Sequence, residues 1–235
     1  MYTVRSHIRS LTRKGGSLTT EEASSGGGAG HRPEGEADAN TVKRALRQGL
    51  LTVRNSLPPG DVERTGAVLA DRAARLPELA RARTVAAYVS VGREPDTAPL
   101  LAALRERGVR VLLPVLMDDD DLDWGEYAGL ASLAAVRRAG RMTLWEPTGP
   151  RLGPEAVCAA DAVLLPGLAV DGTGTRLGRG GGSYDRVLAR LAAAGTNPPL
   201  IVLLYDHEVV EEVPAQAHDR PVHTVVTPSG VRHFG

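Results

Sequence analysis

The stretch from Arg176 to Arg186 reads RLGRGGGSYDR and combines residue types that suit phosphate binding. Successive glycines let the backbone approach an anion closely, and the N–H groups that open a following helix can donate to it. Arg176 and Arg179 add positive charge, and Ser183 stands where it could cap that helix. Asp185 supplies a carboxylate that suits Mg²⁺ beside bound phosphates. The stretch therefore predicts a local phosphate site with a metal ligand, with a mobile surface loop as the alternative.

This loop differs from two familiar phosphate-binding motifs. It is not a P-loop, because no Gly-Lys-Ser/Thr follows the glycines. It is not a dinucleotide fingerprint either, since counting from Gly178 and Gly180 puts Ser183 at the third glycine position. The residues thus indicate an anion site without naming a reaction.

A second basic feature lies upstream, where Lys43 and Arg47 are spaced i, i+4 on a predicted helix. Side chains at this spacing share a helix face and repel each other unless an anion lies between them. Lysine occurs only at Lys14 and Lys43 in a chain that otherwise uses arginine. The pair indicates a further anion contact, and a solvated helix face is the alternative.

Apolar patterning predicts the elements that must position these residues. Helices are expected from Asn40 to the Pro58-Pro59-Gly60 stop and at about 61–76, 97–108 and 183–195. Strands are expected at 84–91, 109–115, 162–170 and 200–205. Because these strands are apolar throughout, we expect them to be buried on both faces of a largely parallel open sheet. The fold class predicted is a three-layer α/β/α arrangement.

Composition separates an N-terminal extension from the rest of the chain. Residues 1–39 contain GGSLTTEEASSGGGAGHRPEGEADA, which is too poor in large apolar side chains to offset the entropy of ordering. We therefore expect a disordered extension over residues 1–39 and a single α/β domain over residues 40–235.

Charge and cysteine content exclude several classes of protein. Lys+Arg and Asp+Glu both number 28, so no net field favours nucleic acid or an anionic membrane. No apolar run approaches the ~20 residues of a membrane span. The single cysteine, Cys158, rules out an intrachain disulfide and fits a reducing cytoplasm. We expect a cytoplasmic monomer whose partners are small molecules, not nucleic acid or membrane.

Several ordered motifs resemble the 5-formyltetrahydrofolate cyclo-ligase (5,10-methenyltetrahydrofolate synthetase) family. The segment LLPGLAVDGTGTRLGRGGGSYDRVL is similar to its signature, and KRALR at 43–47 to its N-terminal Lys-x-x-Leu-Arg motif. YVSVGREPDT resembles its strand and substrate-binding glutamate, and VPAQAHD its C-terminal segment. The resemblance runs from about Val42 to Thr227 and so omits the N-terminal extension.

This resemblance implies a reaction and assigns site residues. The family converts 5-formyltetrahydrofolate to 5,10-methenyltetrahydrofolate in one-carbon metabolism, using ATP and Mg²⁺ and releasing ADP and phosphate. The ATP-binding residues would be Lys43, Arg47, Arg176, Leu177, Gly178, Arg179, Gly180, Gly181, Gly182, Ser183 and Tyr184. The folate-binding residues would be Val89, Glu94, Arg179 and Ser183. Asp185 and, as a second ligand, Asp219 would bind Mg²⁺.

Three positions depart from the family pattern. Ser183 replaces the first aromatic residue of the usual Gly-Tyr-Tyr-Asp, and Val170 replaces a usual Phe. Glu208 stands where the family often has Gln, which alters any contact that needs the amide N–H₂. The changes at Ser183 and Glu208 keep open a non-catalytic store of folate or nucleotide, and a sugar-phosphate or CoA-handling enzyme is a further alternative.

Aromatic residues for a flat pterin pocket are few, because Phe, Trp and Tyr make up 3% of the chain. Trp124, Trp145 and Tyr184 are the candidates. Core packing is the alternative for both tryptophans.

Overall fold

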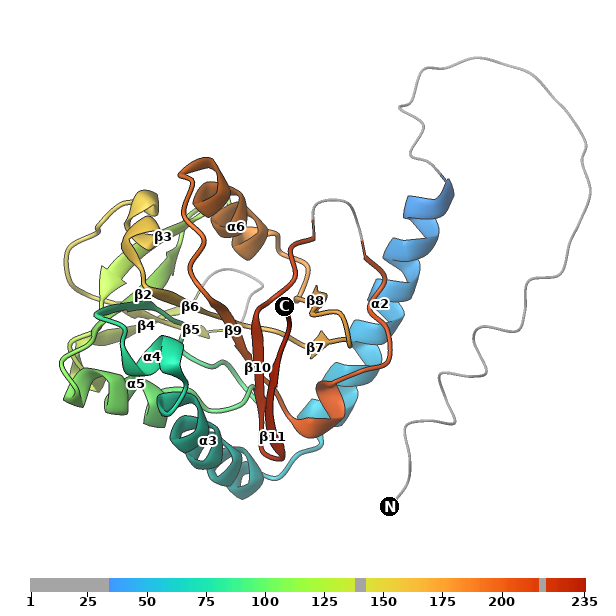
Figure 1. The fold of residues 1–235 in the computed structure, drawn as a ribbon, viewed down its shortest axis with the longest axis horizontal. Helices are drawn as coiled ribbons and strands as arrows, with labels where there is room; N and C mark the ends of the chain where they lie inside the picture. The colour runs from blue at the N-terminus through green and yellow to red at the C-terminus, as the bar shows by residue number, and fades with distance from the viewer. Residues whose placement is uncertain (1–33, 138–142, 216–218) are drawn as a thin grey trace, which may run out of the picture. The chain divides into compact units, whose positions relative to one another are not determined.

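A seven-stranded sheet forms the centre of the protein in a computed structural model that describes residues 34–137, 143–215 and 219–235 (Figure 1). Its strand order is β11-β10-β9-β6-β1-β2-β3. The inner strands run parallel: β10 (Thr224–Thr227), β9 (Leu200–Leu203), β6 (Ala162–Leu165), β1 (Thr84–Ala86) and β2 (Arg110–Leu116). The edge strands β3 (Leu122–Glu126) and β11 (Gly230–His233) pair antiparallel. The prediction of a largely parallel open sheet is confirmed.

Helices cover both faces of this sheet because the inner strands are apolar on both sides. In β6, Ala162 and Leu164 pack into a cluster with α3 (Pro59–Ala74), α4 (Pro77–Ala80) and α5 (Ala98–Glu106). Val163 and Leu165 pack into the opposite cluster with α6 (Ser183–Ala193) and the 3₁₀ helix η2 (Pro154–Ala159). Figure 1 shows α3 and α6 on opposite sides of the sheet. The three-layer α/β/α prediction is confirmed.

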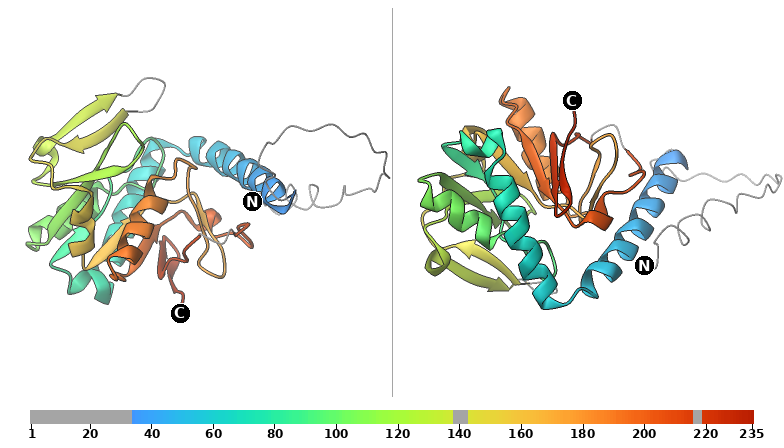
Figure 2. Two further views of the ribbon diagram at one scale, coloured as in Figure 1. Left: turned by 90° about the horizontal axis from the view of Figure 1, so that it is seen from above. Right: turned by 60° about the horizontal axis from the view of Figure 1, so that its bottom comes forward.

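Prolines and glycines set the helix limits as the sequence predicts. Helix α2 (Glu34–Asn55) ends ahead of Pro58, and Pro59 occupies the first position of α3, where its missing N–H costs nothing. Figure 2 shows that α2 and α3 form a V that closes at this corner. Helix α5 ends before Gly108, whose φ of +78° is the left-handed conformation of a helix C-terminus.

Helix α2 packs against a small hairpin of β7 (Ala169–Val170) and β8 (Arg176–Leu177). Leu50 contributes to a separate apolar cluster with residues of this hairpin, including Ala169 and Leu177. The helix begins at Glu34, ahead of the predicted domain start at Asn40. Residues 1–33, most of the predicted extension, lie outside the described residues.

Two predicted strands end earlier than expected. The strand predicted over 84–91 stops at Ala86, and the run 162–170 divides into β6 and β7. Pro166 and Gly167 account for the division, because proline lacks the N–H of a ladder and glycine weakens a strand. The early ends allow both chain segments to turn away from the sheet toward the candidate site.

The remaining elements lie outside the seven-stranded sheet. Strands β4 (Leu133–Arg137) and β5 (Thr143–Pro147) form a separate antiparallel pair, preceded by the 3₁₀ helix η1 (Leu130–Ser132). A further 3₁₀ helix, η3 (Asp206–Glu208), follows β9. Within the described ranges, no helix combines the length and the apolar character needed to cross a membrane.

Candidate active site

The predicted site residues gather beyond the carboxyl ends of the neighbouring strands β1 and β6. The sheet order reverses here, since β2 lies beside β1 on one side while β9 and β10 follow β6 on the other. Open α/β sheets bind ligands in the crevice at such a switch point. Glu94 follows β1, and the loop from Gly178 to Gly182 follows β6 by way of the β7–β8 hairpin. The topology therefore brings the two predicted substrate regions to one place.

Two cations of α2 reach segments that lie far away in sequence. The Lys43 Nζ donates to Asp219 Oδ2 at 2.7 Å, and the lysine side chain is nearly buried. The Arg47 Nε donates to the Gly178 carbonyl oxygen at 2.8 Å. The structure thus brings the basic pair to the glycine loop and to Asp219, while its role with ATP remains a prediction.

Arg176 lies at the base of the glycine loop and is only 8% exposed. Its Nη1 donates to the Pro166 carbonyl oxygen at 3.0 Å, and its Nη2 to Asp185 Oδ1 at 3.2 Å. Burial lowers the pKa of Arg176, whereas the charges of Asp185 and Asp219 oppose that shift. Both predicted metal ligands therefore lie within electrostatic range of one guanidinium.

The donor set at this place suits a metal ion that arrives with phosphates. Among the residues that the structure describes, no cluster of three or more His, Cys, Asp or Glu side chains could hold a metal alone. Mg²⁺ is commonly held by one or two carboxylates together with substrate phosphates and waters. Asp185 and Asp219, which contact the cations Arg176 and Lys43, fit that pattern.

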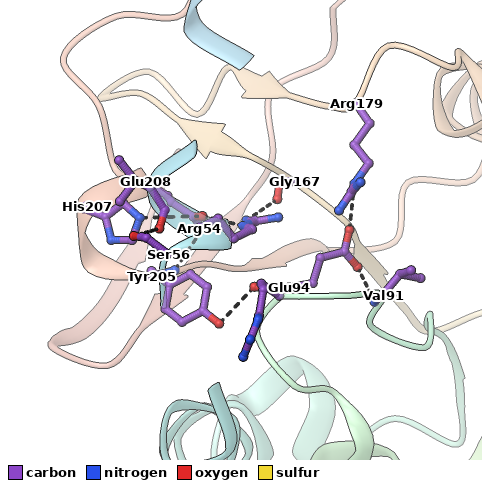
Figure 3. Close-up of polar contacts among 11 residues, drawn as sticks. Arg54, Ser56, Val91, Glu94, Gly167, Arg179, Tyr205, His207 and Glu208 are labelled. Carbon is purple, nitrogen blue, oxygen red and sulfur yellow. Dashed lines mark hydrogen bonds and ion pairs between the residues drawn. The ribbon is translucent and has the colours of Figure 1, made fainter. Parts of the chain in front are cut away.

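Glu94 is held in a tight turn and faces the glycine loop (Figure 3). Its Oε2 accepts the Val91 N–H at 2.8 Å, and its Oε1 accepts the Arg179 Nε–H at 3.0 Å. Gly92 in this turn has a φ of +65°, a conformation that disfavours other residues. The Glu94 side chain is 7% exposed, so the turn holds a nearly buried carboxylate against Arg179.

Two tyrosines lie close to Glu94. Burial raises the pKa of Tyr88 and of Tyr184, and the charge of Glu94 raises both further. Of the three predicted candidates for a flat pterin pocket, Tyr184 is within electrostatic range of Glu94 and is packed, partly buried, against the cluster that contains α6. Trp124 is fully buried in the core, as its alternative stated, and Trp145 is half exposed on β5.

Two other predicted site residues have side chains that pack against apolar clusters. Val89 is partly buried against the cluster that contains α3 and α5. The Leu177 side chain is buried with Leu50 under α2, which leaves its backbone as the part available to a ligand.

The predicted capping role of Ser183 is wrong. Gly182 is the N-cap of α6, with a φ of +76°, and Ser183 is the first helical residue without a side-chain cap hydrogen bond. The glycine takes the cap position because the chain enters the helix in a left-handed conformation. Gly180 also has a positive φ, and a Cβ there would lie 3.5 Å from the guanidinium carbon of Arg47. That distance is an ordinary contact, so Gly180 and Gly182 are required by their left-handed backbone conformation and not by the space beside Arg47.

Comparison with known proteins identifies the family. The model of the 5-formyltetrahydrofolate cyclo-ligase family matches residues 39–228. The chain belongs to this family. It is 41% identical over 191 residues to the 5-formyltetrahydrofolate cyclo-ligase of Mycolicibacterium smegmatis, covering 79% of this chain and 93% of that relative. It is 33% identical over 180 residues to the enzyme of that name from Escherichia coli K12, covering 76% and 96%.

A solved structure of a relative agrees with the fold. The NMR structure of Aquifex aeolicus 5,10-methenyltetrahydrofolate synthetase matches with a TM-score of 0.68 and 29% sequence identity, covering 82% of this chain and 93% of that one. A synthetase from Mycoplasma pneumoniae shares the fold at 19% identity and a TM-score of 0.59. The family resemblance expected from the motifs is confirmed.

In this cyclo-ligase family member, Glu208, one of the positions that depart from the family pattern, contacts Arg54. Arg54 was not identified from the sequence. The Arg54 Nε donates to Glu208 Oε1 at 2.7 Å, and its Nη2 to the Gly167 carbonyl oxygen at 2.9 Å. Both side chains are buried. Burial alone would lower the pKa of Arg54, but the hydrogen bond and charge of Glu208 outweigh it and raise the pKa.

Helical spacing could have revealed Arg54. Lys43, Arg47, Leu50 and Arg54 recur at intervals of four, three and four, which places them on one face of α2. Lys43, Leu50 and Arg54 are the buried residues of that face, whereas Val42 of the apolar pattern is 46% exposed. The helix therefore turns a partly basic face inward.

Asp171 is a second missed residue and connects the β7–β8 turn to the chain before Asp219. Its Oδ1 accepts the N–H groups of Thr173 at 2.8 Å and Thr175 at 3.1 Å, and its Oδ2 accepts the Val213 N–H at 3.0 Å. Burial alone would raise the pKa of Asp171, but the hydrogen bond from the Thr173 hydroxyl and these N–H bonds outweigh it and lower the pKa.

We expect Asp171→Asn to destabilise the protein at pH 7 by about 1.5 to 3 kcal/mol, because it replaces a charged acceptor. Because the pKa of Asp171 is lower in the folded than in the unfolded protein, its ionised form stabilises the fold at pH values above the unfolded pKa. This stabilisation is lost as the pH falls through the pKa of Asp171 in the folded protein. The difference in free energy of unfolding between wild type and variant, measured by urea denaturation, should therefore become smaller in strong acid. Asp71→Asn, at an exposed pair on α3, is the control. A gap that stays constant with pH would contradict the assignment.

Proposed function

We propose that the protein catalyses the ATP-dependent conversion of 5-formyltetrahydrofolate to 5,10-methenyltetrahydrofolate, with release of ADP and phosphate. The observation that carries the proposal is the meeting of Lys43, Arg47, the glycine loop and Glu94 at the switch point of a cyclo-ligase family chain. Cations gathered beside a turn with a nearly buried carboxylate suit one substrate with phosphates and another with N–H donors.

The chemistry needs activation of a poor leaving group. The formyl oxygen attacks the γ-phosphorus of ATP and ADP leaves. N10 of the folate then attacks the activated formyl carbon, its proton is released, and the carbon–oxygen bond breaks as phosphate departs. The protein's contribution to such a reaction is to position the two substrates and to stabilise phosphoryl charge.

The proposed ATP site uses the cations that the structure brings together. Lys43, Arg47, Arg176 and Arg179 would hold the phosphates, together with backbone N–H groups of the glycine loop. Asp185 and Asp219 would hold Mg²⁺, which would neutralise charge on the transferring phosphoryl group. Each cation contacts a carboxylate or a carbonyl in this structure, so phosphate binding would exchange these partners.

The proposed folate site centres on Glu94. A carboxylate accepts hydrogen bonds only, which suits the N–H groups along the edge of a pterin ring. Tyr184 is near this carboxylate and would offer a flat apolar surface. Val89 and Ser183 would line the same pocket.

The decisive test is the absorbance of the methenyl product, followed with purified protein, 5-formyltetrahydrofolate, ATP and Mg²⁺. We expect product only when all three are present. Tight folate binding without product would favour the non-catalytic store instead. Family membership gives no support to the sugar-phosphate or CoA alternative. Only turnover that does not require ATP would favour that alternative.

The proposal extends to the organisation of the chain. Residues 40–235 would be the working domain, acting as a cytoplasmic monomer. Removing residues 1–33, so that the chain begins with helix α2, should leave turnover and the melting temperature nearly unchanged, because the site residues all lie from Lys43 onward. The full-length protein is the control. A large loss of either quantity would give the extension a structural or functional part.

A further inference from the structure

Tyr205, which follows β9, is held from three directions. Its backbone N–H donates to Glu208 Oε2 at 3.0 Å. The Arg54 guanidinium lies over its ring at 5.9 Å from the centroid, and His207 stacks on the ring at 5.6 Å with an interplanar angle of 12°. The residue as a whole is 5% exposed. A side chain fixed in this way can hold whatever its hydroxyl contacts.

The hydroxyl of Tyr205 contacts the turn that presents Glu94. It donates to the carbonyl oxygen of Arg93 at 3.1 Å, one residue before Glu94. Burial raises the pKa of Tyr205 to about 12, so the hydroxyl remains a donor at neutral pH. Two local bonds close this turn, from the Glu94 N–H to the Val91 carbonyl and from the Val91 N–H to the Glu94 carboxylate. Tyr205 supplies a contact from a distant part of the chain.

The contact completes a closed circuit of interactions around the site, and Figure 3 shows the part that includes Arg54, Glu208, Tyr205, Glu94 and Arg179. Helix α2 holds the glycine loop through Arg47 and Gly178, and holds η3 through Arg54 and Glu208. Tyr205 joins η3 to the Glu94 turn. The Glu94 carboxylate returns to the glycine loop through Arg179. Without the Tyr205 hydroxyl, the Glu94 turn would lose its direct hydrogen bond to the segment that begins η3.

We propose that Tyr205 is a positioning residue for the folate substrate, acting through Glu94. Its hydroxyl fixes the Arg93 peptide and so sets where the Glu94 carboxylate meets the pterin edge. This inference rests on the proposed function. Core packing alone would not require the hydroxyl, since phenylalanine fills nearly the same volume.

Tyr205→Phe tests the role because it removes one hydroxyl and leaves the ring. We expect KM for 5-formyltetrahydrofolate to rise about threefold to tenfold, the effect of one hydrogen bond, with kcat and KM for ATP changed less than about twofold. Tyr127→Phe is the matched control, since Tyr127 is also 5% exposed and lies outside the circuit. It should leave every kinetic constant unchanged. An unchanged folate KM in Tyr205→Phe, or an equal rise in Tyr127→Phe, would overturn the inference.

A double variant separates positioning from general loss of structure. In Glu94→Gln the carboxylate is gone, so adding Tyr205→Phe should raise the folate KM little further. Two independent, multiplying effects would overturn the inference. The dissociation constant of 5-formyltetrahydrofolate, measured by calorimetry on the same proteins, applies the test even if no product forms. If the wild type turns over and Tyr205→Phe has no effect, this inference alone is wrong. If the wild type neither forms product nor binds folate, the proposed function is wrong as well.

Discussion

The Glu208→Ala variant is expected to lower the free energy of unfolding by about 3 to 5 kcal/mol, because it leaves the buried Arg54 charge without its counter-ion. The Tyr205 N–H would lose its acceptor in the same variant. Arg54 cannot become neutral by losing a proton, so the free-energy cost of its buried, unpaired charge remains. Urea denaturation monitored by circular dichroism measures the change.

Two further variants show whether charge accounts for the loss. Glu155→Ala removes an exposed glutamate from its pair with Arg190, and should cost at most about 1 kcal/mol. Combining Glu208→Leu with Arg54→Met replaces the buried pair by apolar side chains of comparable length, and should recover a large part of the lost stability. If this double variant is as unstable as Glu208→Ala, the loss comes from packing and not from the unpaired charge.

The Arg179→Ala variant is expected to lower turnover by a factor of about ten or more, since it removes charge that would stabilise the transferring phosphoryl group. The Arg179 side chain is 37% exposed, so its removal should change stability little. The methenyl absorbance assay with saturating ATP and folate gives kcat directly.

Arg186→Ala is the matched control for Arg179. Arg186 is an exposed arginine of helix α6 whose guanidinium donates to the Asp119 carbonyl oxygen and does not contact Glu94. Its loss should leave kcat unchanged. Arg179→Lys, which keeps the charge but not the planar fork, should retain more activity than Arg179→Ala. Equal kcat in wild type and Arg179→Ala would remove Arg179 from the site.

The layers of the fold could be predicted because they depend on local patterns. The apolar runs that became β6 and β9 send alternate residues to both faces, as continuous apolarity predicts. The ends of the strands were harder to predict from the sequence. Strand β1 stops at Ala86, although the apolar run continues to Val91. Where a strand ends depends on its neighbours' lengths, and those partners lie far along the chain.

The candidate site could be predicted where motifs carry it and not where single side chains meet across long distances. Lys43, Arg47 and the glycine loop have recognisable spacing, and the structure brings them together. Arg54 shares the helix face of Lys43 and Arg47, but no spacing points to its partner Glu208, because their contact joins positions 154 residues apart. The capping residue of α6 was predicted wrongly for another reason, because the left-handed conformation of Gly182 does not follow from residue type alone.

The pairing of the site's cations bears on how a nucleotide first encounters the protein. Lys43, Arg176 and Arg179 each already face a carboxylate, and the chain as a whole has a formal net charge of zero. Such a surface projects little field into solution, so it would not draw anions in from a distance as a basic cleft does. The association rate of ATP should consequently vary little with ionic strength, and discrimination among anions would begin only on contact.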